Sequence, residues 1–458
     1  MARFMQRCST GRADIAVIGD SNTYITDAYD TANKPSGWVH SLTDVWGQHF
    51  GLYAWQLTTV ADTTWNGSPG ASGPYFVKPG TATRNVFDSG VSVNISKYMI
   101  TGGGWLTTSG FAKLTGDTSL TRATSNICYI QVRTTNPLNT ANPRINLTCG
   151  MMTGASQPIT GWIRRESPNW VGTDALNTFT VPAAGTATPA GTPSTLYDTY
   201  MDFNSLLGID QGVYLCREGG SVAGEFAMLY QRLEDKNATK GVSVSCLLYQ
   251  GGLTTRDAAL ALQGMTQFQL GEYYRQLTRL QNVSTEDAML CIVIRQGNND
   301  RQSGSNLPSV GTSVGATHMP TNTVQGFYEN LSEVMRQCQV KWNAAGFTPN
   351  NLFFMISGGH PVTPAMRSYD VATQELSIRN IVNEFQNATI VRWSDIATIA
   401  DIDAVNGYFY GNSNGAADYH LSYTGNMLMD SRTLTALLSA SDFPGGSWSG
   451  GLRNRLSF

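Results

Sequence analysis

Short apolar runs alternate with helical segments over the C-terminal half of the chain, and this order constrains the fold more than any other feature. The runs are predicted to be buried strands, at GVSVSCLLYQ, AMLCIVIRQG, NLFFMISGG and ATIVRW. Helices are predicted between and after them, at 256–281, 323–346, 373–387 and in SYTGNMLMDSRTLTALLSAS. Strands that alternate with helices form βαβ units, so the pattern predicts a parallel sheet.

The same pattern opens the chain. ADIAVIG at 13–19 predicts a buried strand that ends in glycine, and 37–51 predicts a helix with one apolar stripe. From about residue 58 the chain becomes rich in Gly, Ser, Thr, Asn and Pro, with short alternating segments that are typical of antiparallel β structure. We therefore expect one α/β domain, formed by 1–57 and 241–440, that is interrupted by a β-rich, sandwich-like domain at 58–240.

Composition limits the settings in which this chain works. Only 14% of the residues are charged and the formal charge is -3, a balance that argues against nucleic-acid binding, which requires a basic face. No apolar run approaches the roughly 18 residues of a membrane span, and the N-terminus has no apolar region of a secretory signal. We expect synthesis in the cytoplasm without membrane insertion, and a virion or tail component is one setting that fits. The Gly-rich segment 441–458 is expected to be an extension outside the core.

The cysteines point to free thiols. Seven of them are scattered without the spacing of a metal site or a disulfide framework, at positions 8, 128, 149, 216, 246, 291 and 338. Buried free thiols of a protein made in a reducing compartment are therefore expected. No residues have metal-ligand spacing and no glycine pattern fits a dinucleotide or phosphate loop, so neither a metal nor a cofactor is expected.

Four predicted strand ends carry polar residues, and ligands of open α/β sheets bind beyond such ends. The four segments are GDSN at 19–22, GGLTT at 251–255, GNND at 297–300 and DYHLS at 418–422. Each alone is weak, because Ser, Gly and Asn are ordinary turn and cap residues and a single His is more often structural. Together they offer a serine, a base to take its proton, and donors for an oxyanion.

In this order the four segments resemble the motif blocks of the SGNH-hydrolase (GDSL esterase/lipase) superfamily. The family has a Gly-Asp-Ser turn, an oxyanion glycine, a Gly-x-Asn-Asp segment and an Asp-x-x-His near the C-terminus. The resemblance covers roughly 11–57 and 241–440, and leaves the insertion out. It implies a three-layer, flavodoxin-like α/β domain and a serine esterase without a cofactor.

The resemblance also implies roles for individual residues. Ser21 would be the nucleophile, and His420 the general base and later the acid. The backbone N–H groups of Ser21 and Gly252 and the side chain of Asn299 would form the oxyanion hole. Gly252 is chosen over Gly251 because the family's glycine begins a Gly-x-Thr-Thr/Ser tail.

The chain departs from the family at the residue that orients the histidine. The family's Asp lies three residues before His, where this chain has Ala417, and Asp418 lies two residues before it. Asp418 is the candidate third member of a triad, while a backbone carbonyl in its place, or a Ser-His dyad, stays open. Asp20 is expected to cap its own turn. His360 is expected to be a turn residue, with a contact to the substrate as the alternative.

The substrate is suggested by the insertion and by what the chain lacks. Trp and Tyr residues occur there among Asn, Thr and Ser, a mixture that suits sugar rings, although most of them are expected to be β core. No amphipathic segment resembles a lipase lid. The sequence predicts an O-acetyl esterase that acts on a polysaccharide or glycan, as SGNH domains of phage tail proteins do, with the insertion shaping its cleft or binding glycan.

An alternative from another class stays open. The chain would then be a structural or glycan-binding protein of the virion or tail type, whose hydrolase domain is vestigial. The displaced Asp418 is the feature that favours it. The sequence leaves a homo-oligomer open in both cases.

Overall fold

The chain forms two compact units. The first consists of Met1–Leu52, Ser89–Val93 and Thr239–Phe458, and the second of Tyr53–Asp88 and Asn94–Ala238. The computed structural model describes residues 1–20, 38–56, 76–77, 105–108, 111–114, 128–132, 142–152, 159–166, 175–181, 193–202, 211–217, 226–249, 253–264, 267–301, 323–360, 371–393, 421 and 423–441. Of the predicted extension at 441–458, residues 442–458 lie outside the described residues, and Ser441 is the last residue of a helix.

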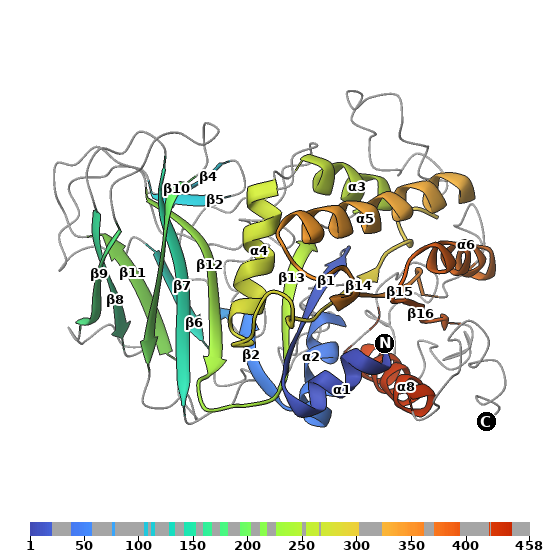
Figure 1. The fold of residues 1–458 in the computed structure, drawn as a ribbon, viewed down its shortest axis with the longest axis horizontal. Helices are drawn as coiled ribbons and strands as arrows, with labels where there is room; N and C mark the ends of the chain where they lie inside the picture. Colours follow the sequence, from blue (N-terminus) through green and yellow to red (C-terminus); the bar gives the residue numbers. More distant parts are fainter. Residues whose placement is uncertain are drawn as a thin grey trace, which may run out of the picture. The chain divides into compact units, whose positions relative to one another are not determined.

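The first unit is built on five parallel strands in the order β13-β1-β14-β15-β16 (Figure 1). The strands are β1 (Arg12–Gly19), β13 (Gly241–Tyr249), β14 (Leu290–Arg295), β15 (Leu352–Ser357) and β16 (Ala388–Ile390). In chain order the sheet runs 2-1-3-4-5, which is one of the orders of doubly wound sheets. The expected α/β character with parallel strands is confirmed.

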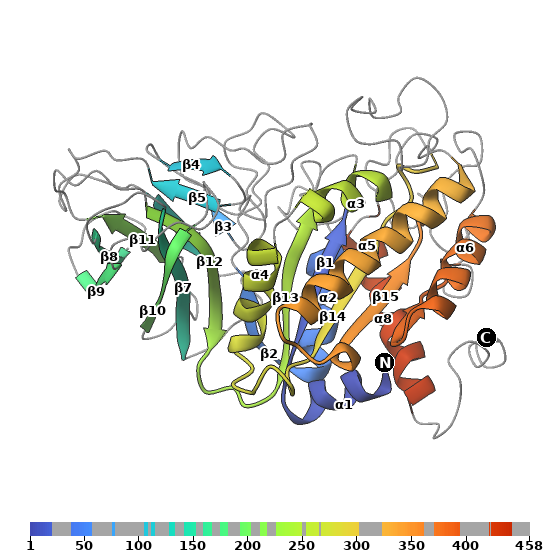
Figure 2. The ribbon, with the colours of Figure 1, turned by 45° about the horizontal axis from the view of Figure 1, so that its top comes forward.

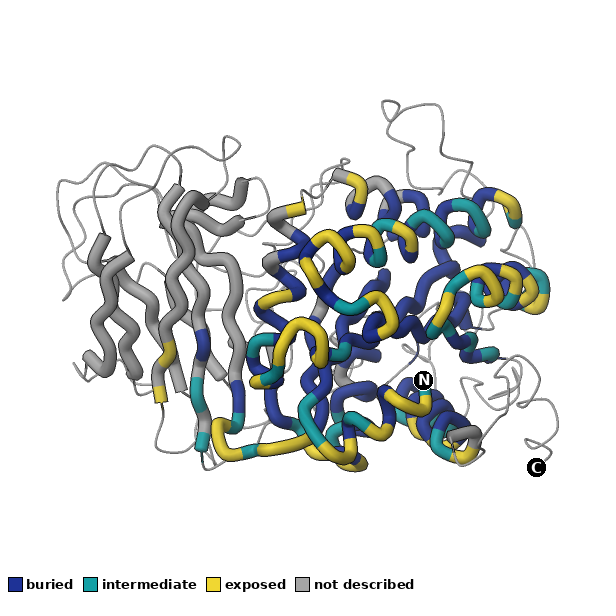
Figure 3. The backbone as a smooth tube through the Cα atoms, viewed as in Figure 1, coloured by how far each residue is buried: buried dark blue, intermediate teal, exposed yellow. Residues whose placement is uncertain are grey.

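Helices cover both faces of this sheet (Figure 2). On one face lie α1 (Ala2–Thr10), α2 (Trp38–Phe50) and α8 (Tyr423–Ser441). On the other lie α3 (Thr255–Gly264), α4 (Gln267–Arg279), α5 (Val324–Ala344) and α6 (Val371–Glu384). A short 3₁₀ turn, η2 (Pro349–Asn351), leads into β15. Because both faces are covered, β14 and β15 are buried at every position and are dark blue in Figure 3.

The helices differ from the prediction in two places. The single helix expected at 256–281 is two helices, since α3 ends at Gly264 and α4 begins at Gln267. Each has its own packing partners: α3 packs on α5, whereas α4 packs on both α5 and β1. The sequence did not predict α1, although its Phe4, Met5 and Cys8 form the buried stripe of an amphipathic helix.

The second unit is antiparallel. One set of strands follows the order β10-β7-β12-β2, with β5 paired to β12 and β4 to β5, and a five-stranded sheet has the order β3-β6-β11-β8-β9. The bounds are β2 (Leu52–Gln56), β3 (Phe76–Val77), β4 (Trp105–Thr108), β5 (Phe111–Leu114), β6 (Cys128–Val132), β7 (Pro143–Met152), β8 (Ile159–Glu166), β9 (Ala175–Val181), β10 (Pro193–Asp202), β11 (Gln211–Arg217) and β12 (Phe226–Asp235). The strand expected at 92–100 lies outside the described residues.

Three cysteines of the first unit are free and buried, at Cys8, Cys291 and Cys338. Burial raises the pKa of Cys291 and of Cys338 to about 12, and raises the pKa of Cys8 well above its ordinary value. Since the thiolate is the reactive form, these thiols should be inert in the folded protein.

Iodoacetamide at pH 8 should therefore leave these three cysteines unmodified in the native protein and alkylate them in urea. Peptide mapping by mass spectrometry of both samples measures the difference. Native-state alkylation of Cys291 at the rate of the unfolded chain would contradict the buried positions.

A buried ion pair joins β14 to α8. The guanidinium of Arg295 donates through Nη2 to Asp430 Oδ1, and the hydroxyl of Ser41 in α2 donates to Asp430 Oδ2. The Arg295 and Asp430 side chains are 7% and 0% exposed. Burial lowers the pKa of Arg295 to about 9, which leaves it charged at neutral pH. The guanidinium carbon lies 4.5 Å from the ring centroid of Trp38 and 5.7 Å from that of Trp393.

Asp430→Asn should lower the free energy of unfolding by about 3–5 kcal/mol, because it leaves the buried guanidinium without its counter-charge. Urea denaturation measures the loss. The control is Arg336→Gln, which removes the ion pair to Glu333 from a side chain that is 55% exposed and should cost about 0–1 kcal/mol. Equal losses of unfolding free energy in the two variants would mean that the buried ion pair stabilises the fold no more than the exposed one.

Candidate active site

The carboxyl ends of β1 and β14 lie side by side at the point where the strand order of the first unit reverses. In doubly wound sheets this is where ligands bind. Of the predicted site residues, Asn299 lies in the described part of the chain. Ser21, Gly252, Asp418 and His420 lie outside it.

Asn299 joins the ends of two other segments. Its Nδ2 donates to Asp20 Oδ2 at 3.2 Å and to Leu253 O at 3.1 Å. Asp20 precedes Ser21 and Leu253 follows Gly252 in the chain, so the amide contacts the immediate neighbours of two candidate residues. An amide nitrogen carries two hydrogens, and both have acceptors here. Asp20, expected to cap its own turn, is 2% exposed and accepts a bond from another loop.

The next residue, Asp300, fixes the start of α3. Its carboxylate accepts from the backbone N–H of Thr255 at 3.1 and 3.2 Å and from Thr255 Oγ1 at 2.5 Å. The side chain is fully buried. A carboxylate at this place satisfies N–H groups that have no partner within the helix and faces the positive end of its dipole. Sequence reasoning gave Asp300 no role, because its partner lies 45 residues away.

Asn298 connects the same loop to the end of β15. Its Oδ1 accepts from Arg301 Nη2 at 3.0 Å, so its Nδ2 is the donor in the 2.9 Å contact with His360 Nδ1. In this arrangement His360 Nδ1 is the acceptor, since an amide nitrogen can only donate. Arg301 also donates to His360 O at 2.9 Å. His360, which the sequence predicts to be a turn residue, is 4% exposed and belongs to this buried network.

Gln374 in α6 holds the loops after β14 and β15 together. Its Oε1 accepts from Gly359 N at 2.7 Å, and its Nε2 donates to Gly297 O at 3.2 Å. Gly297 has φ +130°, and a Cβ there would lie 2.1 Å from Gln374 Nε2. Glycine is therefore required at this position for both its backbone angle and the close approach. Sequence reasoning missed Gln374, and its only signal is a glutamine on the buried side of α6.

A small hollow of about 20 Å³, room for about one water-sized group, lies among these residues. Its lining includes Asp20, Arg295, Asn298, His360, Trp393 and Leu421. Leu421 directly follows His420 in the chain, and its carbonyl accepts from Asn426 Nδ2 at 3.2 Å. Chain neighbours of Ser21, Asn299 and His420 thus line one hollow.

Within the described ranges, no group of three or more His, Cys, Asp or Glu side chains is placed to hold a metal ion. Within the same ranges, the helices are too short or too polar for any of them to cross a membrane.

The side chains of Asp300 and Thr255 should be energetically coupled, because they form a hydrogen bond. Asp300→Ala should cost about 1–3 kcal/mol, because it leaves a buried backbone N–H and a hydroxyl without an acceptor, whereas Thr255→Val should cost about 1 kcal/mol. In a double-mutant cycle followed by urea unfolding, the two losses should not add. Thr435→Val, on the exposed side of α8, is the matched control with little expected effect. Strictly additive losses would show that the two side chains do not interact.

No family model matches this chain, and no curated protein matches it. Among solved structures, the chain is similar to a family two carbohydrate esterase from Cellvibrio japonicus, with 8% identity, 85% of this chain and 98% of that chain covered, and a TM-score of 0.23. It is also similar to the CBM22-1 xylan-binding domain of Xyn10C from Paenibacillus barcinonensis, with 13% identity, 32% and 92% coverage, and a TM-score of 0.23. A carbohydrate-binding module CBM36 in complex with calcium and xylotriose has 11% identity, 30% and 94% coverage, and a TM-score of 0.17. All three TM-scores lie below 0.5.

Proposed function

We propose that this protein is a serine esterase of the SGNH type that removes ester-linked acyl groups, acetyl first among them, from a polysaccharide or glycan. The observation that carries the proposal is the position of Asn299. Its amide contacts Asp20 and Leu253, which are the chain neighbours of the proposed nucleophile Ser21 and of the proposed oxyanion glycine Gly252.

The sheet of the first unit supports the proposal. Its strand order, 2-1-3-4-5, is that of flavodoxin-like domains, which bind ligands at the carboxyl ends of their first and third strands. Here these strands are β1 and β14, which lead into the segments of Ser21 and Asn299. We propose that 1–57 and 241–440 form this hydrolase domain, that 58–240 is an inserted domain and that 441–458 is an extension.

The proposed reaction follows from the chemistry of these groups. Ser21 Oγ attacks the ester carbonyl carbon while His420 takes its proton, and the carbonyl oxygen becomes an oxyanion. The backbone N–H groups of Ser21 and Gly252 and the Asn299 amide donate to that oxygen. The oxyanion then collapses and breaks the ester C–O bond, and His420 gives its proton to the departing sugar oxygen, which leaves as a hydroxyl. Water, deprotonated by His420, attacks the acyl carbon in turn, and the acid leaves as the bond to Ser21 Oγ breaks and His420 returns the proton to it. Asp418 would orient His420, with a backbone carbonyl or no third group as the alternatives.

The contacts of Asn299 add a condition to this mechanism. Because Asp20 Oδ2 and Leu253 O accept both hydrogens of its amide, one of these bonds has to be exchanged for the bond to the oxyanion. The bond to Leu253 O is neutral and the bond to Asp20 is charge-assisted, so the neutral one is the easier to exchange.

The second candidate function is a glycan-binding or structural protein of the virion or tail type with a vestigial hydrolase domain. Two features favour it: Ala417 stands where the family has its Asp, and both hydrogens of the Asn299 amide are engaged. Catalytic turnover separates the two functions.

Turnover of p-nitrophenyl acetate should be lost in Ser21→Ala and should fall roughly 100–1,000-fold in kcat in Asn299→Ala, the usual effect of removing one oxyanion donor. Ser439→Ala, an exposed serine of α8, is the control and should match the wild type. Acetate released from an acetylated polysaccharide should follow the same ranking. A wild-type protein as inert as Ser21→Ala would favour the vestigial domain.

A further inference from the structure

We propose that one face of β10 and β7 in the second unit is a binding site for a pyranose ring of a neutral polysaccharide, with Tyr200 as the surface on which the ring stacks. The ligand class rests on the proposed function, while the site itself follows from the register and contacts of these two strands.

The register places five polar residues on the same face. Tyr200 of β10 pairs with Asn146 of β7, and Asp202 pairs with Arg144. On the other side of β7, Glu234 of β12 also pairs with Arg144. Side chains of directly paired residues point to the same side of a sheet, and successive ones alternate. These five side chains therefore share one face.

Tyr200 and Asp202 are exposed members of this face, and Tyr200 is the aromatic one. Tyr200 is 50% exposed. In the described part of the chain three large hydrophobic residues are exposed, and again Tyr200 is the aromatic one; the others are Val340 and Leu376. The guanidinium carbon of Arg144 lies 4.0 Å from the centre of the Tyr200 ring, a cation–π contact. A flat ring that is half exposed and contacts a fixed guanidinium is suited to stack against the C–H face of a sugar.

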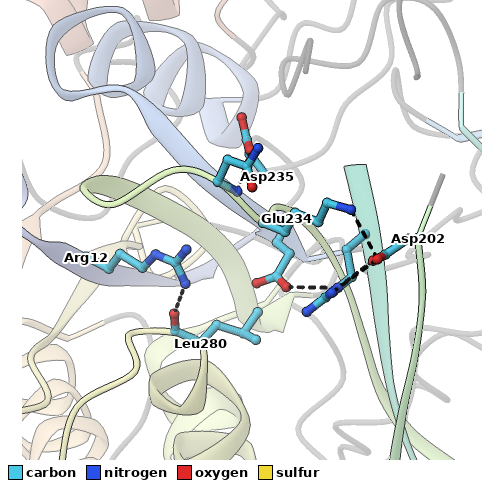
Figure 4. A network of polar contacts seen from close by, with 8 residues as sticks. Arg12, Asp202, Glu234, Asp235 and Leu280 are labelled. Atoms are coloured by element: carbon cyan, nitrogen blue, oxygen red, sulfur yellow. Dashed lines mark hydrogen bonds and ion pairs between the residues drawn. The ribbon is translucent and has the colours of Figure 1, made fainter. Parts of the chain in front are cut away.

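The support behind the ring is itself held in place, and Figure 4 shows the contacts that converge on Asp202. Asp202 accepts from Arg144 Nε at 2.6 Å and from Arg144 Nη2 at 3.2 Å, and it accepts from Lys236 Nζ at 3.1 Å. The hydrogen bond from Arg144 lowers the pKa of Asp202, and the bond to Asp202 raises the pKa of Arg144, so both stay charged at neutral pH. Side chains that are held in place before binding lose little conformational entropy when the ligand binds.

The charges of the face point to a neutral ligand. Arg144 and Lys236 are balanced by Asp202 and Glu234, so the face attracts neither a polyanion nor a polycation. Around the ring these groups present both donors and acceptors, as the hydroxyl groups of a sugar require. Asn146, across from Tyr200, is 9% exposed, and within the described residues its Nδ2 has no hydrogen-bond acceptor. It would donate to a ligand hydroxyl.

The test is binding of the full-length protein to insoluble cellulose, xylan, mannan and chitin, none of them acetylated, measured by depletion from solution. The wild type should bind at least one of them. Tyr200→Ala should weaken that binding at least tenfold, and Tyr200→Phe, which keeps the ring, should stay within about threefold. Leu376→Ala, an exposed apolar residue of α6 in the first unit, is the matched control and should bind as the wild type does.

Three results would overturn the inference: no binding by the wild type, unchanged binding by Tyr200→Ala, or equal loss in Tyr200→Phe and Tyr200→Ala. The esterase proposal fails separately. If the wild type binds polysaccharide but does not turn over p-nitrophenyl acetate, the esterase proposal alone is contradicted. If it turns over p-nitrophenyl acetate but does not bind, the Tyr200 site alone is contradicted.

Discussion

Buried loops have to satisfy their polar groups within the chain, and this requirement shapes the carboxyl edge of the parallel sheet. Three consecutive residues after β14 satisfy polar groups of three other segments. Asn298 binds the ring of His360 after β15, Asn299 contacts Asp20 after β1, and Asp300 accepts from the first turn of α3. Because the three residues are neighbours in the chain, a shift of any one loop disturbs the partners of the other two.

A second polar contact fixes the helices beside this edge. Arg295, the last residue of β14, is paired with Asp430 of α8, which also binds Ser41 of α2. α8 follows the segment that contains His420, and α2 follows the segment that contains Ser21. Catalytic groups act only when they are held in place by the structure around them. The ion pair holds α2 and α8 to the end of β14 from one buried position.

Sequence patterns predicted the sheet and most helices of the first unit, because the hydrophobic pattern of a buried strand or an amphipathic helix lies within a short stretch of sequence. The division of 256–281 into α3 and α4 could not be predicted this way, since each helix has its own packing partners. The site shows the same limit. GNND was found from its order in the chain, whereas Gln374, 77 residues after Gly297, belongs to the site only through space.

Active-site labelling tests the central claim most directly, because it requires the nucleophile, the base and the oxyanion donors to work together. A fluorophosphonate probe should label the native protein once per chain, at Ser21, with no labelling after denaturation, as shown by peptide mapping. Absence of labelling on the native protein, or labelling at a different serine, would contradict the account.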